Sequence, residues 1–356
     1  MASLTRYSRR VDARVALLLV VAGACSRHSA APRAELVGDP LGDWRTTPSE
    51  AFARNLWDLQ AFDGKLFVGY GDWDVNTGPT DVISFDPKAG IFAHETTLPE
   101  EAIDRYRVLD GALYVPGVDA MDPINGAIYR RVAGQWQRIV LPQVAHALDV
   151  LRHGEELCVA LQGRMSAGAV RCTRDDGATW SEMSTGSLRA ESLFELGGEL
   201  YVSSRGGVRR IHDGRSDPVE LPMPGATVLH PTRCGDDVIF LVNSATRFDA
   251  FTMRSPDRVT HVEVSGSPAD VFADGDACLV LTNRPGVDGR NEAIIYRRSK
   301  DQTWRIATSA STDSMARSAE ILDGFYYLGL GCANGACGAS AGTLVRVPVQ
   351  PDLPGD

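Results

Sequence analysis

Nine polar or aromatic side chains of this chain could together line a ligand-binding funnel. Each lies shortly before, or at the start of, a short apolar segment that leads into a glycine turn, so the nine occupy comparable positions. They are Trp57, Asp58, Arg105, Tyr106, His146, Glu191, His230, Asp270 and Arg317. Carboxylates beside arginines can bind a polar ligand, and a suitably spaced carboxylate pair can cleave a glycosidic bond. The alternative is that these residues only provide the polar lining of a central channel.

A second group of oxygen-bearing side chains lies after the first glycine turn. Asp72, Asp74, Asn76 and Asp81 present oxygens in alternation, in the manner of a calcium-binding loop. Their spacing departs from the EF-hand pattern, and a polar turn stabilised by Asx hydrogen bonds explains the same residues. Calcium is therefore the candidate metal, and the sequence indicates no other cofactor.

The segment Thr173–Trp180 carries a specific eight-residue motif. Asp175 can accept hydrogen bonds from the backbone and from Thr179, Gly177 permits a tight turn, and Trp180 can pack between neighbouring sheets. This combination predicts a structural turn rather than a catalytic aspartate.

The motif resembles the Asp box (BNR repeat) of sialidases and of many other β-propellers, and Ser299–Trp304 resembles a degenerate copy. The resemblance implies a sialidase-like propeller with the box on the face away from the catalytic site. The Arg-Ile-Pro motif of sialidases is absent from this sequence, so the resemblance does not extend to their activity. Phosphate-loop and dinucleotide-binding motifs are also absent.

A repeat of apolar strand, glycine turn and second apolar strand runs through the chain. The turn glycines are Gly64, Gly111, Gly154, Gly198, Gly235, Gly275 and Gly324, and successive ones are 37 to 49 residues apart. Four short strands fit this period, which is that of one β-propeller blade. The sequence therefore predicts an all-β fold, a seven-bladed β-propeller of four-stranded blades.

The last repeat lacks its fourth strand, because Pro348, Pro351 and Pro354 exclude a central strand there. A strand-like piece, Asp43–Thr46, precedes the first repeat, and we expect it to complete the last blade and close the ring. The expected organisation is a signal peptide (1–25), a tether (26–41), the propeller (42–348) and a C-terminal tail (349–356).

The first 25 residues have the features of an export signal. Arginines are followed by the apolar run Val15–Ala22, which is too short to span a bilayer. The following Ala22–Cys25 resembles a bacterial lipobox, which implies that Cys25 is lipidated and anchors the chain to a bacterial membrane, in the periplasm or at the cell surface. Ala22 stands where the family has leucine, and signal cleavage near Ala24 without lipidation is the alternative.

Six cysteines follow Cys25, an even number that predicts disulfides in an exported protein. One pair flanks a predicted hairpin symmetrically, one brackets a short loop, and the remaining two lie in adjacent repeats. The expected pairs are Cys158–Cys172, Cys332–Cys337 and Cys234–Cys278.

The net charge of -10 and the lack of a basic run argue against a nucleic-acid partner. The sequence favours a lipid-anchored envelope protein whose propeller binds a glycan, a peptide or another envelope protein without catalysis. The alternative is a glycan-acting hydrolase of sialidase-like ancestry. Two carboxylates about 5 to 9 Å apart beside arginines at the channel would favour the hydrolase.

Overall fold

The computed structural model describes residues 31–42, 52–72, 78–122, 124–164, 168–187, 189–223, 225–243, 248–332 and 337–350. These residues form strands and one short 3-10 turn, η1 (Phe52–Arg54), without an α-helix. Within them, no helix has the length and apolar character that crossing a membrane requires. Cys25 and Asp43–Thr46 lie outside the described residues.

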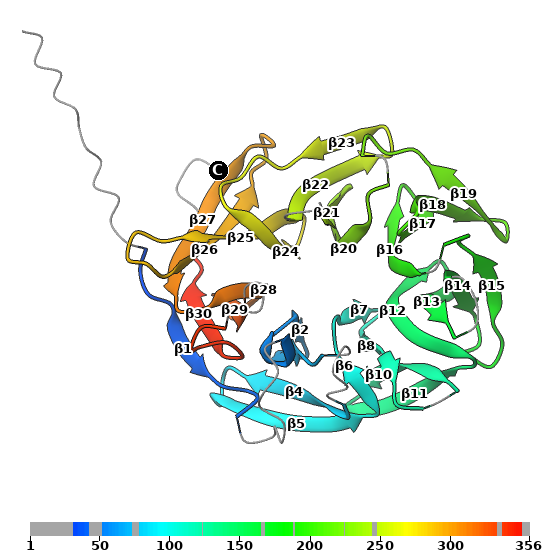
Figure 1. Cartoon of the computed structure of the whole chain (residues 1–356), viewed down its shortest axis with the longest axis horizontal. Coiled ribbons are helices and arrows are strands. Elements are labelled where there is room, and N and C mark those ends of the chain that lie inside the picture. The colour runs from blue at the N-terminus through cyan, green and yellow to red at the C-terminus, as the bar shows by residue number, and fades with distance from the viewer. Residues whose placement is uncertain are drawn as a thin grey trace, which may run out of the picture.

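Seven four-stranded antiparallel sheets surround a central axis, which confirms the predicted seven-bladed propeller (Figure 1). Blade 1 contains β2 (Asp58–Phe62), β3 (Lys65–Gly69), β4 (Thr80–Asp86) and β5 (Ile91–Leu98), and blade 2 contains β7 (Arg107–Leu109), β8 (Ala112–Pro116), β10 (Gly126–Val132) and β11 (Gln135–Leu141). Blade 3 contains β12 (Val144–His153), β13 (Glu156–Gly163), β14 (Gly168–Thr173) and β15 (Ser181–Ser184), and blade 4 contains β16 (Ala190–Leu196), β17 (Glu199–Ser204), β18 (Gly207–His212) and β19 (Arg215–Val219).

The remaining blades follow the same order from the axis outward. Blade 5 contains β20 (Val228–Cys234), β21 (Asp237–Asn243), β22 (Phe248–Ser255) and β23 (Arg258–His261), and blade 6 contains β24 (Ser267–Asp274), β25 (Ala277–Pro285), β26 (Asn291–Arg298) and β27 (Trp304–Thr312). Blade 7 contains β28 (Met315–Leu322), β29 (Phe325–Gly331), β30 (Leu344–Pro348) and β1 (Glu35–Gly38). A small extra sheet pairs β6 (Glu100–Ala102) with β9 (Val118–Ala120).

The recurrent Asp-Gly turns have a conformational cause. Asp63 and Gly64 have φ values of 53° and 71°, and Asp110 and Gly111 have values of 48° and 72°. Two successive positive φ angles define the hairpin turn whose twist matches that of the flanking strands. Aspartate tolerates this conformation and glycine adopts it freely, which is why the pair recurs at the first turn of a blade.

The ring closes through an N-terminal strand, as predicted, but not through the predicted one. β1 pairs antiparallel with β30, so that Glu35 lies opposite Arg346. Arg346 donates to both carboxylate oxygens of Glu35, at 3.0 and 2.7 Å. The edge of β30 is therefore occupied, and the prediction that Asp43–Thr46 fills it is wrong.

The closing strand lies inside the segment that the sequence assigned to a tether. β1 has only four residues, too few for an alternating pattern to appear among the surrounding alanines, prolines and arginines. The residues before it also bind the ring: the amide of Ala34 donates to Ser311 of blade 6 at 3.2 Å, and the Ser311 amide donates to Pro32 at 2.8 Å. The chain thus joins the ring at the outer edge of blades 6 and 7.

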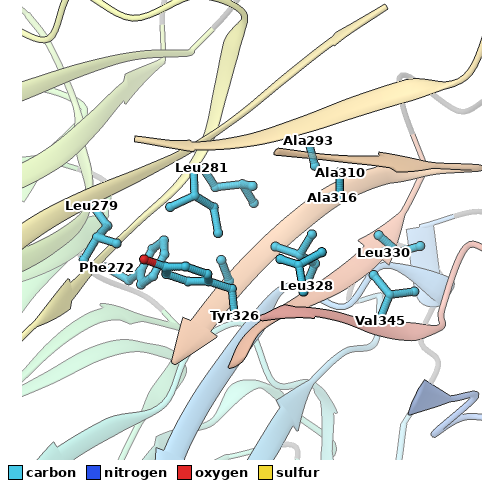
Figure 2. Packing of buried hydrophobic residues seen from close by; sticks show 13 residues of the cluster. Phe272, Leu279, Leu281, Ala293, Ala310, Ala316, Tyr326, Leu328, Leu330 and Val345 are labelled. Atoms are coloured by element: carbon cyan, nitrogen blue, oxygen red, sulfur yellow. The ribbon is translucent and has the colours of Figure 1, made fainter. Parts of the chain in front are cut away.

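The apolar core consists of seven clusters, each of which lies between two consecutive blades. Between blades 6 and 7, Phe272 and Leu279 face Tyr326 and Leu328 (Figure 2). Another cluster unites the last blade with the first, so no blade leaves an apolar face uncovered. Burial between blades contributes about 25 cal/mol for each Å² of apolar surface removed from water.

All three predicted disulfides are present, at 158–172, 234–278 and 332–337. Cys158 and Cys172 stand directly opposite each other on β13 and β14. Cys234 and Cys278 connect blade 5 to blade 6. Three disulfides indicate an oxidising environment outside the cytoplasm.

Removal of β1 should destabilise the ring. A chain that begins at residue 39 leaves the edge of β30 unpaired, and we expect it to melt at a lower temperature and to aggregate more readily than a chain that begins at residue 32. Thermal denaturation with light scattering compares the two. Glu35→Ala in the longer chain is the control, since an exposed ion pair contributes at most about 1 kcal/mol. Equal melting temperatures for the two chains would rule out closure by β1.

The disulfide between blades should contribute more stability than the local one. It closes a loop of 44 residues, whereas Cys332–Cys337 closes a loop of 5. Chain entropy predicts losses of about 4 and about 2 kcal/mol, respectively, when each pair is replaced by alanines. Urea denaturation of the two double variants measures the difference, and a larger loss for the local pair would contradict this ordering.

Candidate functional site

Carboxylates on the innermost strands bind the backbone of the next blade around the channel. Asp58 of blade 1 accepts the amide of Tyr106 at 2.6 Å. Asp149 of blade 3 accepts the amide of Leu193 in blade 4 at 2.9 Å, and Asp270 of blade 6 makes the same bond to blade 7 at 2.9 Å. An innermost strand has no neighbour on its axial side, so these carboxylates satisfy amides that would otherwise lack partners.

Glu320 of blade 7 continues this pattern across the seam of the ring. Its carboxylate accepts the amide of Ala61 in blade 1 at 3.3 Å and the side-chain amide of Gln60 at 3.1 Å. The hydroxyl of Ser318 donates to the carbonyl of Leu56 at 2.7 Å. Polar contacts therefore reinforce the junction of blades 7 and 1 from inside the channel.

Two arginines of blade 2 bridge the channel between these carboxylates. Arg107 forms a bidentate pair with Asp149, at 2.9 and 2.7 Å. Arg105 and Arg107 also donate to the carbonyl of Pro231 in blade 5, at 2.9 and 3.1 Å. Blade 5 lies across the ring from blade 2 (Figure 1). The two side chains therefore reach across the channel at this level.

Burial and charge set the protonation of this network. Burial, together with the charge of Asp270, raises the pKa of Asp58 to about 7, and burial raises the pKa of Glu320 to about 8. Burial also acts to raise the pKa of Asp149, but the neighbouring arginines outweigh it and the pKa lies below its ordinary value. When Asp58 and Glu320 are protonated, the number of negative charges in the channel approaches the number of positive charges on its arginines.

The remaining predicted funnel residues also have partners inside the protein. The indole of Trp57 donates to the carbonyl of Gly71 at 2.8 Å, and the Arg317 guanidinium lies 5.4 Å from its ring. Arg317 donates to the carbonyl of Cys332. Tyr106 is buried and donates to the carbonyl of Val68 at 3.1 Å.

Three predicted residues lie near a charged side chain. Glu191 lies 3.0 Å from Arg189 and 3.6 Å from Arg205. A histidine nitrogen approaches a carboxylate in two further pairs, which are His146–Asp119 at 3.9 Å and His230–Asp270 at 3.4 Å. The structure thus brings the predicted residues around one channel, where each has a partner within the protein.

Sequence reasoning missed Arg107, Glu320 and Asp104. Arg107 lies two residues after Arg105, and the two-residue period of a strand, which places both on one face, was the available signal. Asp104 is half-buried and forms no hydrogen bond within the described residues. Burial raises its pKa to about 6, against the opposing effects of Arg189 and His230.

The proposed calcium ligands are only partly described, because Asp74 and Asn76 lie outside the described residues. Asp81 accepts hydrogen bonds from Thr97 at 2.6 Å and from His94 at 3.2 Å. In the described part of the chain, the metal-ligand cluster found is Glu156 with Cys158 and Cys172. Those two sulfurs form a disulfide, so this cluster offers no thiolate to a metal.

Asp175 lies in the turn between β14 and β15, away from the channel. Its carboxylate accepts the amide of Thr179 at 2.8 Å and the hydroxyls of Thr179 and Thr173 at 2.7 Å, and these bonds lower its pKa to about 2. Gly177 has a φ of 90°, and a Cβ there would lie 2.5 Å from Ile139. Trp180 packs against the cluster between blades 2 and 3.

A Gly-x-Ser-x-Gly spacing occurs at Gly338–Gly342, and sequence reasoning missed it. In hydrolases this motif places a serine on a sharp turn from a strand to a helix. Here Ser340 lies in the turn before β30, and its hydroxyl donates to Ser314 at 3.1 Å. No described histidine hydrogen-bonds to Ser340, so the motif forms no nucleophile–base pair.

A groove of about 810 Å³ opens on the other end of the blades, and we call it the blade 6 groove. It runs beside the turns that join the first strand to the second and the third to the fourth, whereas the predicted funnel residues lie at the opposite ends of these strands. Residues from blades 5, 6 and 7 line it, among them Asp237, Arg254, Arg298, Lys300, Ile306 and Val349. Sequence reasoning missed it because its walls come from turns that are far apart in the chain.

A buried carboxylate organises one wall of this groove. Asp237 accepts Arg254 at 2.8 and 3.3 Å and Arg298 at 2.5 Å. The disulfide of Cys234 lies beside it and holds blades 5 and 6 together. Ile306, which is 59% exposed, also lines the groove. The lining of the blade 6 groove therefore combines fixed charged side chains with apolar ones.

Comparisons with known proteins show the fold. No family model matches the chain, and no curated protein matches it in sequence. Virginiamycin B lyase from Staphylococcus aureus superposes with a TM-score of 0.59 and 12% identity, over 84% of this chain and 96% of that one. A chain of the mitotic checkpoint complex gives 0.58 and 13%, over 98% and 100%. A proposed 6-phosphogluconolactonase from Bacteroides fragilis gives 0.53 and 12%, over 82% and 97%. Neighbours this different show a propeller fold without fixing an activity.

The buried acid of the channel predicts a pH dependence of stability. The pKa of Asp58 is about 7 in the folded chain and about 3.9 in an unfolded one. The folded chain therefore binds more protons between these values, and the contribution of Asp58 to stability is lost as the pH rises through this window. We expect Asp58→Asn, which keeps the acceptor for Tyr106, to reduce the fall in melting temperature between pH 5 and pH 8 by several degrees. Melting curves that run parallel for the variant and the wild type would refute this assignment.

Proposed function

We propose that this chain is an envelope-anchored lipoprotein whose propeller is a non-enzymatic binding module, and that the ligand occupies the blade 6 groove. The observation that carries this proposal is the groove itself. Its volume of about 810 Å³ lies within the range of about 300 to 1,000 Å³ that is typical of ligand sites. It also offers charged and apolar walls side by side.

The channel supports a structural role better than a catalytic one. A glycoside hydrolase needs one carboxyl group that can donate a proton and another that can act as base or nucleophile. Asp58, Asp149, Asp270 and Glu320 each accept a backbone amide of a neighbouring blade, so each carboxyl group is held against the wall of the ring. Substrate would also have to displace the two arginines that bridge the channel. These contacts favour binding over the hydrolase alternative.

The position of the N-terminal strand is compatible with an anchor. The described chain begins beside the outer edge of blades 6 and 7, where Pro32 and Ala34 bind Ser311. A membrane tether that precedes Pro32 would hold the ring by its rim and would leave the blade 6 groove accessible.

The proposed anchor is tested at Cys25. Cys25→Ser should move the protein from the membrane fraction into the soluble fraction and abolish incorporation of labelled palmitate. Cys25→Ser leaves the propeller and its disulfides unchanged, so the melting temperature of the soluble domain is the control. A wild-type protein that incorporates no palmitate would refute lipidation.

The binding site is tested with two matched isoleucines. Ile306 in the groove is 59% exposed, and Ile91 on the outer strand of blade 1 is 58% exposed. For any ligand found on glycan or peptide arrays with the chain from residue 32, Ile306→Trp should weaken binding at least about tenfold by filling the groove. Ile91→Trp should leave binding unchanged.

Two outcomes would contradict the proposal. One is a ligand whose affinity falls with Glu191→Gln at the channel and not with Ile306→Trp. The other is turnover of a fluorogenic glycoside by the purified domain, which would favour the hydrolase.

A further inference from the structure

We propose that the ligand of the blade 6 groove carries a compact oxyanion, a carboxylate or a phosphate, which binds the guanidinium of Arg298. This inference rests on the proposed function of the groove and adds the chemical class of its ligand.

The hydrogen-bonding capacity of Arg298 is mostly unused. The side chain is 11% exposed and lines the groove. Its one hydrogen bond within the described residues is the donation from Nη2 to Asp237 at 2.5 Å. A guanidinium has five N–H donors, and the described residues provide no second hydrogen-bond acceptor for this one. A ligand oxyanion would supply the missing acceptors.

The charge balance at this wall is also incomplete. Asp237 is 5% exposed and accepts from both Arg254 and Arg298, so two guanidinium groups share one buried carboxylate. Lys300 lines the same groove and has no ion-pair partner within the described residues. The wall therefore keeps a positive charge beside a low-dielectric interior, where attraction for an anion is stronger than in water.

The acidic residues of the rim limit the size of the anion. Asp236 and Asp276 are exposed and line the groove, and both would repel an extended polyanion. Asp274 also lines the groove, but it is paired with Arg297 at 2.6 Å. A single carboxylate or phosphate meets less of this repulsion than an extended polyanion does.

The remainder of the ligand should be uncharged. Ile306, Ala307 and Val349 line the groove beyond the arginines and offer apolar contact. The planar fork of a guanidinium matches the two oxygens of a carboxylate or phosphate, which gives orientation as well as affinity. The ligand class is therefore an organic molecule with one oxyanion group and an otherwise neutral body, such as a uronic acid or a sugar phosphate.

The test uses sodium glucuronate, its neutral methyl ester and inorganic phosphate as probes on the disulfide-bonded chain from residue 32. Binding is followed by calorimetry and by the NMR signal of the Arg298 Nε–H group. We expect glucuronate to bind and to shift this signal, and the ester to bind at least about tenfold more weakly. Phosphate binding as tight as that of glucuronate would indicate general oxyanion recognition, and weaker phosphate binding would indicate a carboxylate site; both support the proposal.

Two variants separate the effect of the forked guanidinium geometry of Arg298 from the effect of its charge. Arg298→Gln should weaken glucuronate binding at least about tenfold, and Arg298→Lys should restore only part of it because lysine keeps the charge without the fork. Arg284→Gln is the matched control: it removes the same charge at the other end of blade 6, from a side chain that is paired with Glu292 and is not among the groove-lining residues, and it should change affinity less than about threefold. Melting temperatures verify that each variant is folded.

The remaining outcomes overturn the inference and distinguish it from the proposed function. Equal affinity for glucuronate and its ester, or equal losses in Arg284→Gln and Arg298→Gln, would refute oxyanion recognition by Arg298 and leave the groove as a binding site for another ligand. No binding of either anion would also refute the inference. Only an array ligand that is insensitive to Ile306→Trp would refute the groove itself.

Discussion

Each blade of this propeller is apolar on both faces, and each face must be covered by a neighbouring blade. Seven clusters between blades meet this requirement, including the one that joins blade 7 to blade 1. A ring that failed to close would expose two of these faces and the edge of β30. The pairing of β1 with β30 therefore supports every other junction, since it completes the last blade. The inter-blade disulfide at Cys234 strengthens one further junction.

Closure of the ring also determines what the channel contains. The innermost strand of each blade has backbone N–H groups on its channel side. No further strand lies there to accept hydrogen bonds from them. Asp58, Asp149 and Asp270 accept such amides, and Arg105 and Arg107 cross the channel between them. Asp58, Asp270 and Arg105, which the sequence predicts as ligand-binding residues, thus form bonds that join blades. Space for a ligand remains on the opposite end of the blades, in the blade 6 groove.

The sequence predicted the features that depend on local patterns. The spacing of the turn glycines predicted seven four-stranded blades. Positions around a hairpin and a short loop predicted two disulfides, and the two cysteines that remained, in adjacent repeats, form the third. The closing strand was misplaced because four residues, Glu35–Gly38, carry too little pattern and gain their stability from β30. The groove could not be predicted, because Asp237, Arg254 and Arg298 meet only after blades 5 and 6 pack together. The funnel residues were located in the right part of the fold, but their mutual contacts depend on distances across the channel.

Hydrogen exchange of the axial amides tests most directly whether the channel carboxylates hold the ring. The amides of Tyr106, Leu193 and Ala319 donate to the carboxylates of Asp58, Asp149 and Asp270 rather than to a neighbouring strand. These three hydrogen bonds are therefore what protects the amides from exchange. If the carboxylates join the blades as described, these three amides will exchange as slowly as the central strands, through unfolding of the whole ring. Fast exchange of the three amides while the strands stay protected would contradict the account, because the channel carboxylates would then be free to bind a ligand.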